Sequence, residues 1–185
     1  MQTTRVALIS VLTALCLAIQ LYPRPPNVEF TSLLTFIVGV IYGSFTGVLF
    51  GGFIMFVNGF LSPWGFAGLN MPFQMVGMGI VGLSGGFYGR FWDRKLSLRS
   101  LFEAAVMGAS LTLVYDFVTN FGVAVIYSLA GTPIHLALIS ALISGVPFSL
   151  IHIISNVFVF GFLFAPISCG ILQFVGVKNW LRREP

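Results

Sequence analysis

Residues 147–175 read PFSLIHIISNVFVFGFLFAPISCGILQFV, a stretch without Asp, Glu, Lys or Arg. A helix needs about 20 mostly apolar residues to cross the hydrocarbon core of a bilayer. The stretch is long enough for such a helix, although Pro166 is expected to interrupt it. It therefore predicts a membrane-spanning segment that begins near Pro147.

The composition of the whole chain agrees with a membrane protein. Of its 185 residues, 57% are hydrophobic and 8% are charged, and the mean hydropathy is +1.00. A soluble domain carries about 25% charged residues, so this composition argues against water-soluble enzymes and disordered chains. The net charge of +4 comes from basic residues that are spread among loops. They form no continuous patch of the kind that binds nucleic acid.

Long apolar runs predict six spans in one domain, residues 1–185. The expected ranges are 4–21, 29–42, 45–60, 71–88, 101–128 and 147–175. The second and third could instead form one long helix, because only Gly43 and Ser44 separate them. Residues 129–146 are expected to form an outer loop, in which 134–143 could be an interfacial helix.

The basic residues predict the topology. Apart from Arg24, which the topology places outside, they lie at the start of the first span, after the fourth and after the last: Arg5, then Arg90, Arg94, Lys95 and Arg99, then Lys178, Arg182 and Arg183. The positive-inside rule places these three regions in the cytoplasm. Six spans satisfy this rule, whereas five would put the two basic ends on opposite sides. The predicted fold class is an all-α integral membrane protein, a compact bundle of six transmembrane helices with both termini cytoplasmic.

Polar side chains inside the predicted spans indicate a binding site. Asp116 and Asn120 share one face of the fifth span, and His152 and Asn156 repeat this spacing on the last. Ionisable groups within a span are costly and usually functional. With Gln74 near the outer end of the fourth span, these residues can converge in the outer half of the bundle. The alternative is structural hydrogen bonding between helices.

The loops expected on the outer face are more elaborate than the Gly43-Ser44 turn. Residues 22–27 contain three prolines, and residues 61–70, which include Trp64 and Asn70, are long and aromatic. Elaborate loops on one face favour a site that opens there. Plain loop packing is the alternative.

Small residues form a second pattern. Ser10, Ala14 and Ala18 recur at four-residue spacing on the first span. Such faces allow helices to approach closely, so this stripe is a candidate partner surface. The many glycines of residues 77–89 are more typical of packing within the bundle.

The chain resembles the membrane-embedded substrate-binding (S) component of an energy-coupling factor (ECF) transporter. The size, the six spans and the small-residue stripe match that family. So do NMPFQMVGMG at residues 70–79, VGL at 81–83 and YDFVTNFG at 115–122.

The resemblance implies a subunit that captures a vitamin or related micronutrient at the outer face and is not an enzyme. It implies that a transmembrane coupling subunit docks on Ser10, Ala14 and Ala18, and that two cytosolic ATPase subunits supply the energy. The chain has no G-x-x-x-x-G-K phosphate-binding motif of its own. The expected location is the cytoplasmic membrane of a prokaryote.

The predicted pocket carries few charges, which favours a neutral or weakly cationic ligand. Its residues are Trp64, Asn70, Gln74, Asp116, Asn120, His152 and Asn156. Corrinoid, riboflavin-like and thiamine-like ligands all fit this description, and long uncharged loops that could cap a large ligand favour a corrinoid. No cofactor is expected, and Cys16 and Cys169 match no metal-binding spacing.

Two other functions compete with this interpretation. A self-sufficient small-molecule transporter or channel has the same composition. An intramembrane serine protease would use Ser84, in a G-x-S-G sequence, with His152 as its base. Ser84 lies roughly 20 Å below the outer end of its predicted helix and His152 roughly 7 Å below its own, a difference that argues against the protease.

Overall fold

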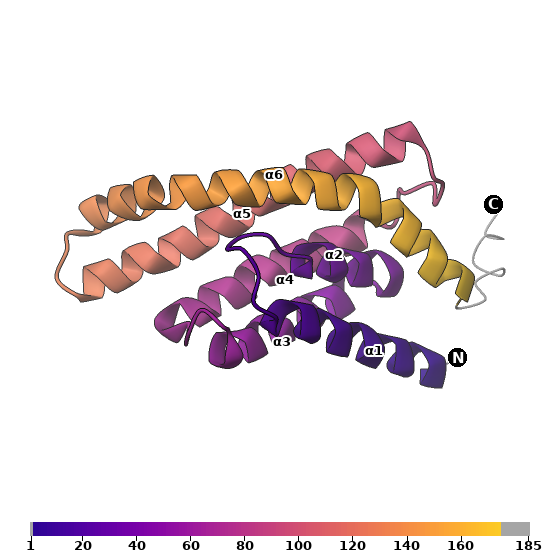
Figure 1. Cartoon of the computed structure of the whole chain (residues 1–185), viewed down its shortest axis with the longest axis horizontal. Helices are drawn as coiled ribbons and strands as arrows, with labels where there is room; N and C mark the ends of the chain where they lie inside the picture. The colour runs from indigo at the N-terminus through magenta and orange to yellow at the C-terminus, as the bar shows by residue number, and fades with distance from the viewer. Residues whose placement is uncertain (1, 175–185) are drawn as a thin grey trace.

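The computed structural model describes residues 2–174, and these residues contain helices and no strand. The elements are α1 (Gln2–Leu21), α2 (Thr31–Tyr42), α3 (Ser44–Leu61), the short 3₁₀ helix η1 (Gly68–Asn70), α4 (Met71–Tyr88), α5 (Leu98–Leu129) and α6 (Ile134–Phe174) (Figure 1). The predicted separation of α2 from α3 is confirmed. Gly43 makes the turn between them with a φ of +93°, a conformation that favours glycine.

The prediction for residues 129–146 was wrong, because most of this segment belongs to α6. The helix starts at Ile134 and runs through Pro147 and Pro166 without a break. Ala137 and Ala141 are buried against Ala124 of α5, so the contact between the two helices begins well before Pro147. Membrane helices tolerate prolines where neighbouring groups satisfy the freed backbone. As a result α5 and α6 form a hairpin that projects beyond the other helices (Figure 1).

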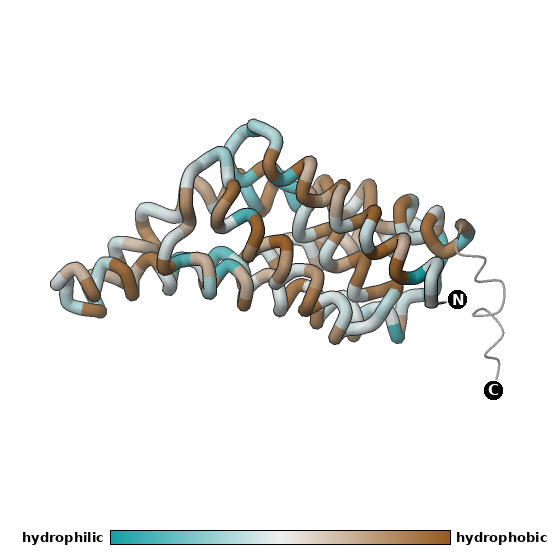
Figure 2. The backbone as a smooth tube through the Cα atoms, turned by 90° about the horizontal axis from the view of Figure 1, so that it is seen from below, coloured by the Kyte–Doolittle hydropathy of each residue, from teal (hydrophilic) through white to brown (hydrophobic). Residues whose placement is uncertain are grey.

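The chain is a multi-pass membrane protein, although its helices differ in length. Within residues 2–174, four helices are long and apolar enough to span a bilayer: α1, α3, α5 and α6. Helix α2 has 12 residues and is about 18 Å long, which is shorter than a hydrocarbon core of about 30 Å. The prediction of six helices is thus confirmed for the described residues, but six full spans are not shown, because α2 is too short and α4 is not among the four helices. Figure 2 shows the hydrophobic residues spread along all of them.

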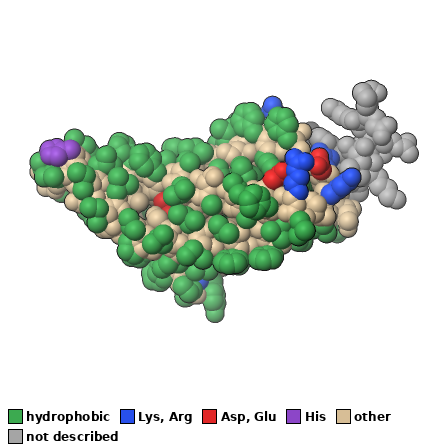
Figure 3. Space-filling view, turned by 90° about the horizontal axis from the view of Figure 1, so that it is seen from above, with side chains coloured by type: hydrophobic (Ala, Val, Ile, Leu, Met, Phe, Trp, Pro, Cys, Tyr) green, Lys and Arg blue, Asp and Glu red, His purple; other side chains and the backbone are tan. Residues whose placement is uncertain are grey.

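Charged side chains gather at one end of the molecule, where α1 begins and α6 ends (Figure 3). This end carries the basic residues that follow α4. Outside the described residues lie the expected end of the last span, Val175, and the basic residues that follow it, Lys178, Arg182 and Arg183.

Helix α4 packs between α2 and α3 through contacts of glycine with backbone. Added Cβ atoms at Gly82 and Gly85 would collide with the backbones of Gly47 and Phe36. Small residues permit such close approach in membrane helices. Helix α1 packs more loosely, and its Ser10, Ala14 and Ala18 are exposed on the surface.

Candidate functional site

A cavity of about 460 Å³ lies where the loop between α1 and α2 meets the loop between α3 and α4. Its wall combines both loops with side chains from the helices. The main lining residues are Gln20, Arg24, Glu29, Met55, Asn58, Trp64, Phe66, Gln74, Met78, Tyr115, Phe148 and His152. This volume lies within the usual range of small-molecule sites, about 300–1,000 Å³.

Arg24 holds the proline-rich loop between α1 and α2 against the end of α1. Its guanidinium donates to the backbone oxygen of Gln20 at 2.6 Å, to Gln20 Oε1 at 2.6 Å and to the backbone oxygen of Val28 at 2.8 Å. Thr31 Oγ1 also donates to Gln20 Oε1, at 2.7 Å. These bonds join both ends of the loop, so its cavity-facing residues have a defined position.

Glu29 ends this loop and points into the bundle. Its Oε2 accepts a hydrogen bond from the backbone N–H of Ser32 at 2.9 Å, in the first turn of α2, where a negative charge is favourable. Its Oε1 lies 3.3 Å from His152 Nε2 and 3.4 Å from Asn156 Nδ2. Burial raises the pKa of Glu29, but hydrogen bonds with His152 and Ser32 outweigh it and hold the pKa below its usual range.

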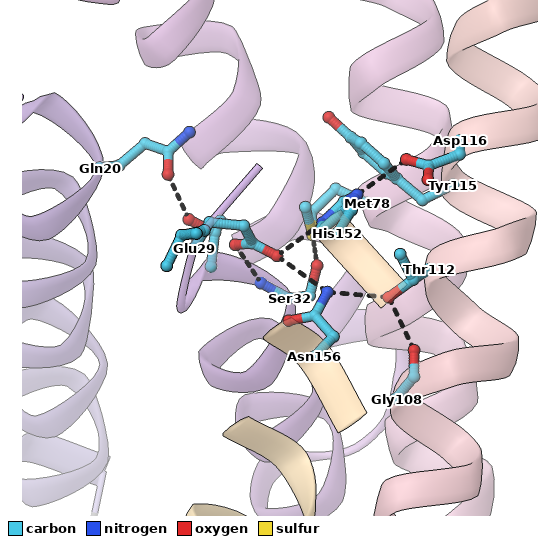
Figure 4. A network of polar contacts seen from close by, with 12 residues as sticks. Gln20, Glu29, Ser32, Met78, Gly108, Thr112, Tyr115, Asp116, His152 and Asn156 are labelled. Carbon is cyan, nitrogen blue, oxygen red and sulfur yellow. Dashed lines mark hydrogen bonds and ion pairs between the residues drawn. The ribbon is translucent and has the colours of Figure 1, made fainter. Parts of the chain in front are cut away.

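His152 bridges two carboxylates (Figure 4). Its Nδ1 lies 2.8 Å from Asp116 Oδ1, and its Nε2 faces Glu29. A neutral imidazole has one donor nitrogen, whereas an imidazolium has two. The geometry therefore fits the imidazolium, which donates to both acids. The imidazole ring also packs edge-on against the ring of Tyr115, with 5.8 Å between the two centroids.

The polar network continues below the cavity. Asn156 Nδ2 donates to Thr112 Oγ1 at 2.8 Å, and Thr112 donates to the backbone oxygen of Gly108 at 2.7 Å. Asn156 is fully buried. The network thus connects the loop that carries Glu29 with α5 and α6.

The predicted site residues fall into three groups. Trp64, Gln74 and His152 line the cavity. Asp116 and Asn156 contact the lining residues His152 and Glu29 from behind. The other two lie at helix contacts, because Asn70 packs against Gly122 and Asn120 against Gly145.

Sequence reasoning missed Glu29 as a site residue, because it stood at the very start of a predicted span. A signal was available: Glu29 is the first acidic residue of the chain, and the next is Asp93. An isolated acid immediately before a long apolar run is expected to find a buried partner. Asn58 and Tyr115 were missed as well, since single polar residues on apolar helices carry no pattern.

Two amide oxygens of the cavity wall have no hydrogen-bond partner, Asn58 Oδ1 and Gln74 Oε1. Asp116 Oδ2 is also buried without one. A buried polar atom without a partner is costly, and Asn58 and Gln74 line the cavity, so a turn of either amide towards the cavity would offer an acceptor to a ligand that carries N–H or O–H groups. The described residues contain no group of three or more His, Cys, Asp or Glu side chains that could hold a metal ion.

The geometry does not support a serine protease. Both ring nitrogens of His152 face carboxylates. Ser84 is followed in α4 by Gly85 and Gly86, which pack against the backbones of Phe36 and Ser44. This part of α4 lies beside the α2–α3 turn and contributes nothing to the cavity lining.

The family model described as "ECF transporter, substrate-specific component" matches residues 4–174. No curated protein and no solved structure gives a significant match.

Proposed function

The chain belongs to the substrate-specific component family of ECF transporters, and from this premise we propose that it captures a neutral, vitamin-sized heterocycle in the cavity described above. The observation that carries this proposal is a cavity of about 460 Å³ whose lining includes two residues with unpartnered amide oxygens, Asn58 and Gln74. The proposed location is a prokaryotic cytoplasmic membrane, with the cavity open to the outside.

The balance of charged side chains around the cavity supports a neutral ligand. Arg24 and His152 carry two positive charges, and Glu29 and Asp116 carry two negative ones. An uncompensated charge in a buried site is costly. A ligand with a net charge would disturb this balance, whereas a neutral ligand leaves it intact.

The wall also supports a planar ligand with hydrogen-bonding edges. Trp64, Phe66 and Phe148 are exposed aromatic rings at the cavity, and aromatic faces stack on flat ring systems. Asn58 and Gln74 supply acceptors. A complete corrinoid, with its macrocycle and nucleotide loop, is much larger than the cavity, so the volume favours a riboflavin-like molecule over the corrinoid that the loops alone favoured.

Mass spectrometry of small molecules that co-purify with the protein tests this proposal. We expect one neutral heterocycle that dissociates on unfolding and rebinds to the emptied protein with one-to-one stoichiometry. An intact corrinoid, or a ligand with a net charge, would contradict it. Protein emptied of small molecules that binds none of a panel of vitamins would also count against the proposed capture role.

Gln74→Leu should weaken binding of the co-purified molecule about tenfold. Loss of one hydrogen bond costs about 0.5–1.5 kcal/mol, and tenfold corresponds to about 1.4 kcal/mol. Calorimetric titration of the emptied protein measures the change. Asn120→Ala is the comparison, because Asn120 lies outside the cavity wall, and an equal loss of affinity in both variants would remove Gln74 from the site.

The partner surface is proposed to be the exposed stripe of Ser10, Ala14 and Ala18 on α1. Replacement of both alanines by leucine should reduce co-purification of the coupling subunit at least tenfold while ligand affinity stays unchanged, because bulk on this face keeps a partner helix at a distance. Ser110→Leu, on an exposed position of α5, is the control. Unchanged complex formation by Ala14→Leu/Ala18→Leu would show that the partner binds elsewhere.

Energy is proposed to come from two ATPase subunits bound to the coupling subunit. Liposomes that contain this chain alone should bind the co-purified molecule without accumulating it, and uptake should require the partners and ATP. Uptake by the chain alone would instead establish a self-sufficient transporter or channel.

A further inference from the structure

Glu29, His152 and Asp116 form a buried triad at the cavity. His152 lies between the two carboxylates, 3.3 Å from Glu29 Oε1 and 2.8 Å from Asp116 Oδ1. The three side chains are 9%, 5% and 12% exposed, in the order Glu29, His152, Asp116. Glu29 and His152 are themselves part of the cavity wall.

The positive charge that faces both acids belongs to His152. The other cation of the cavity wall, Arg24, donates to Gln20 and to the backbone of Val28. Asp116 Oδ2 is buried without a hydrogen-bond partner, so the acid pair has an acceptor that His152 does not satisfy. Two carboxylates around a central donor, next to a cavity, are the arrangement that an organic cation would need.

We propose that His152 determines the charge of the ligand. Its imidazolium occupies the position between Glu29 and Asp116 that a cationic ligand group would otherwise take, and so restricts the cavity to neutral ligands. This inference rests on the proposed function, since it concerns selectivity in the same cavity.

Replacement of His152 should convert the site from neutral to cationic selectivity. Gln removes the charge but keeps a hydrogen-bonding side chain, whereas Lys keeps a cation on a flexible chain. The probes are benzamide and benzamidinium, two flat molecules of similar shape that differ by one charge. At neutral pH we expect His152→Gln to bind benzamidinium at least tenfold more tightly relative to benzamide than the wild type does. His152→Lys should keep the wild-type ratio.

A second variant tests the same charge balance from the other side. Asp116→Asn removes one negative charge and leaves the imidazolium in place, so it should favour benzoate over benzamide at least tenfold relative to the wild type. Because Asp116→Asn keeps His152, it still tests the proposal if His152→Gln fails to fold. All proteins are purified whole in detergent, emptied of small molecules and titrated by calorimetry, with folding checked by their thermal unfolding.

The outcomes separate this inference from the function on which it rests. Probe ratios that stay at the wild-type value in folded His152→Gln or Asp116→Asn, or an equal shift in His152→Gln and His152→Lys, would overturn the role of His152. Wild-type protein that binds no small molecule at all would contradict the proposed function instead. Opposite shifts in the two variants support His152 as the determinant of ligand charge.

Discussion

Gly82→Ala is expected to destabilise the protein by about 3 kcal/mol or more, enough to remove most of the folded species. A Cβ atom at position 82 would collide with the carbonyl group of Gly47 and lie 2.8 Å from the backbone nitrogen of Val48. Overpacked side chains usually cost about 1–3 kcal/mol because neighbouring side chains adjust. Here the colliding atoms are backbone, so α3 and α4 must separate.

Separation of α3 from α4 would also disturb the other contacts that α4 makes. Gly85 meets the backbone of Phe36, and Gly86 meets Ser44, so both helices of the α2–α3 pair depend on the position of α4. Gln74 and Met78 on the same helix line the cavity. A displaced α4 should therefore reduce ligand binding together with stability.

The measurement is thermal unfolding in detergent, followed by intrinsic fluorescence, together with the yield of monodisperse protein. Gly79→Ala is the matched control on the same helix, because its Cβ would touch only Val48 Cγ1 at 3.6 Å, an ordinary contact. We expect Gly79→Ala to unfold within a few degrees of the wild type. Equal unfolding temperatures for Gly82→Ala and Gly79→Ala would show that α3 and α4 do not pack as described.

Glu29→Ala is expected to cost about 3–5 kcal/mol of stability, the range for removal of one partner from a buried ion pair. The substitution leaves the backbone N–H of Ser32 without its acceptor, His152 with Asp116 alone and Asn156 Nδ2 with Thr112 alone. It also removes the contact that joins the loop of the cavity-lining Arg24 to α6. Ligand binding should therefore fall more than it does in Gln74→Leu.

Equilibrium unfolding in a denaturant series measures the change in stability. Glu103→Ala is the matched control, since it removes a carboxylate from an exposed pair with Arg99, and exposed pairs contribute little. Comparison of the double substitution Glu29→Gln/His152→Gln with each single substitution forms a double-mutant cycle. In such a cycle, residues in contact give changes in stability that do not add. Additive effects of these two substitutions would show that Glu29 and His152 do not interact.

Local patterns predicted the helices whose ends carry local signals. The predicted range 71–88 coincides with α4, where Pro72 stands in the first turn and Gly89 follows the last residue. Gly43 is a local signal of the same kind, and it marked the turn between α2 and α3. The start of α6 was missed because Pro147 reads as a helix boundary, although α5 covers the apolar residues before it.

Part of the candidate site could be predicted in the same way. The spacing of His152 with Asn156, and the position of Gln74 near a helix end, depend on helical geometry alone. Glu29 could not be assigned a partner, since it lies in a loop and its contact with His152 joins residues far apart in the chain. Asn120 shares a helix face with Asp116, but Gly145 lets α6 pack against it, so it faces a helix contact rather than the cavity.

Composition and hydrophobic periodicity determined that this chain is an all-α membrane protein with six helices, and its motifs determined its family resemblance. Both are properties of short segments, because burial in lipid and hydrogen bonding within a helix act on each segment separately. Only the tertiary structure decided that His152 lies between Glu29 and Asp116, and that a cavity remains above them. These features depend on the distances between helices, which include the close contacts of α4 with α2 and α3 and of Gly108 in α5 with α6, and which no single segment contains.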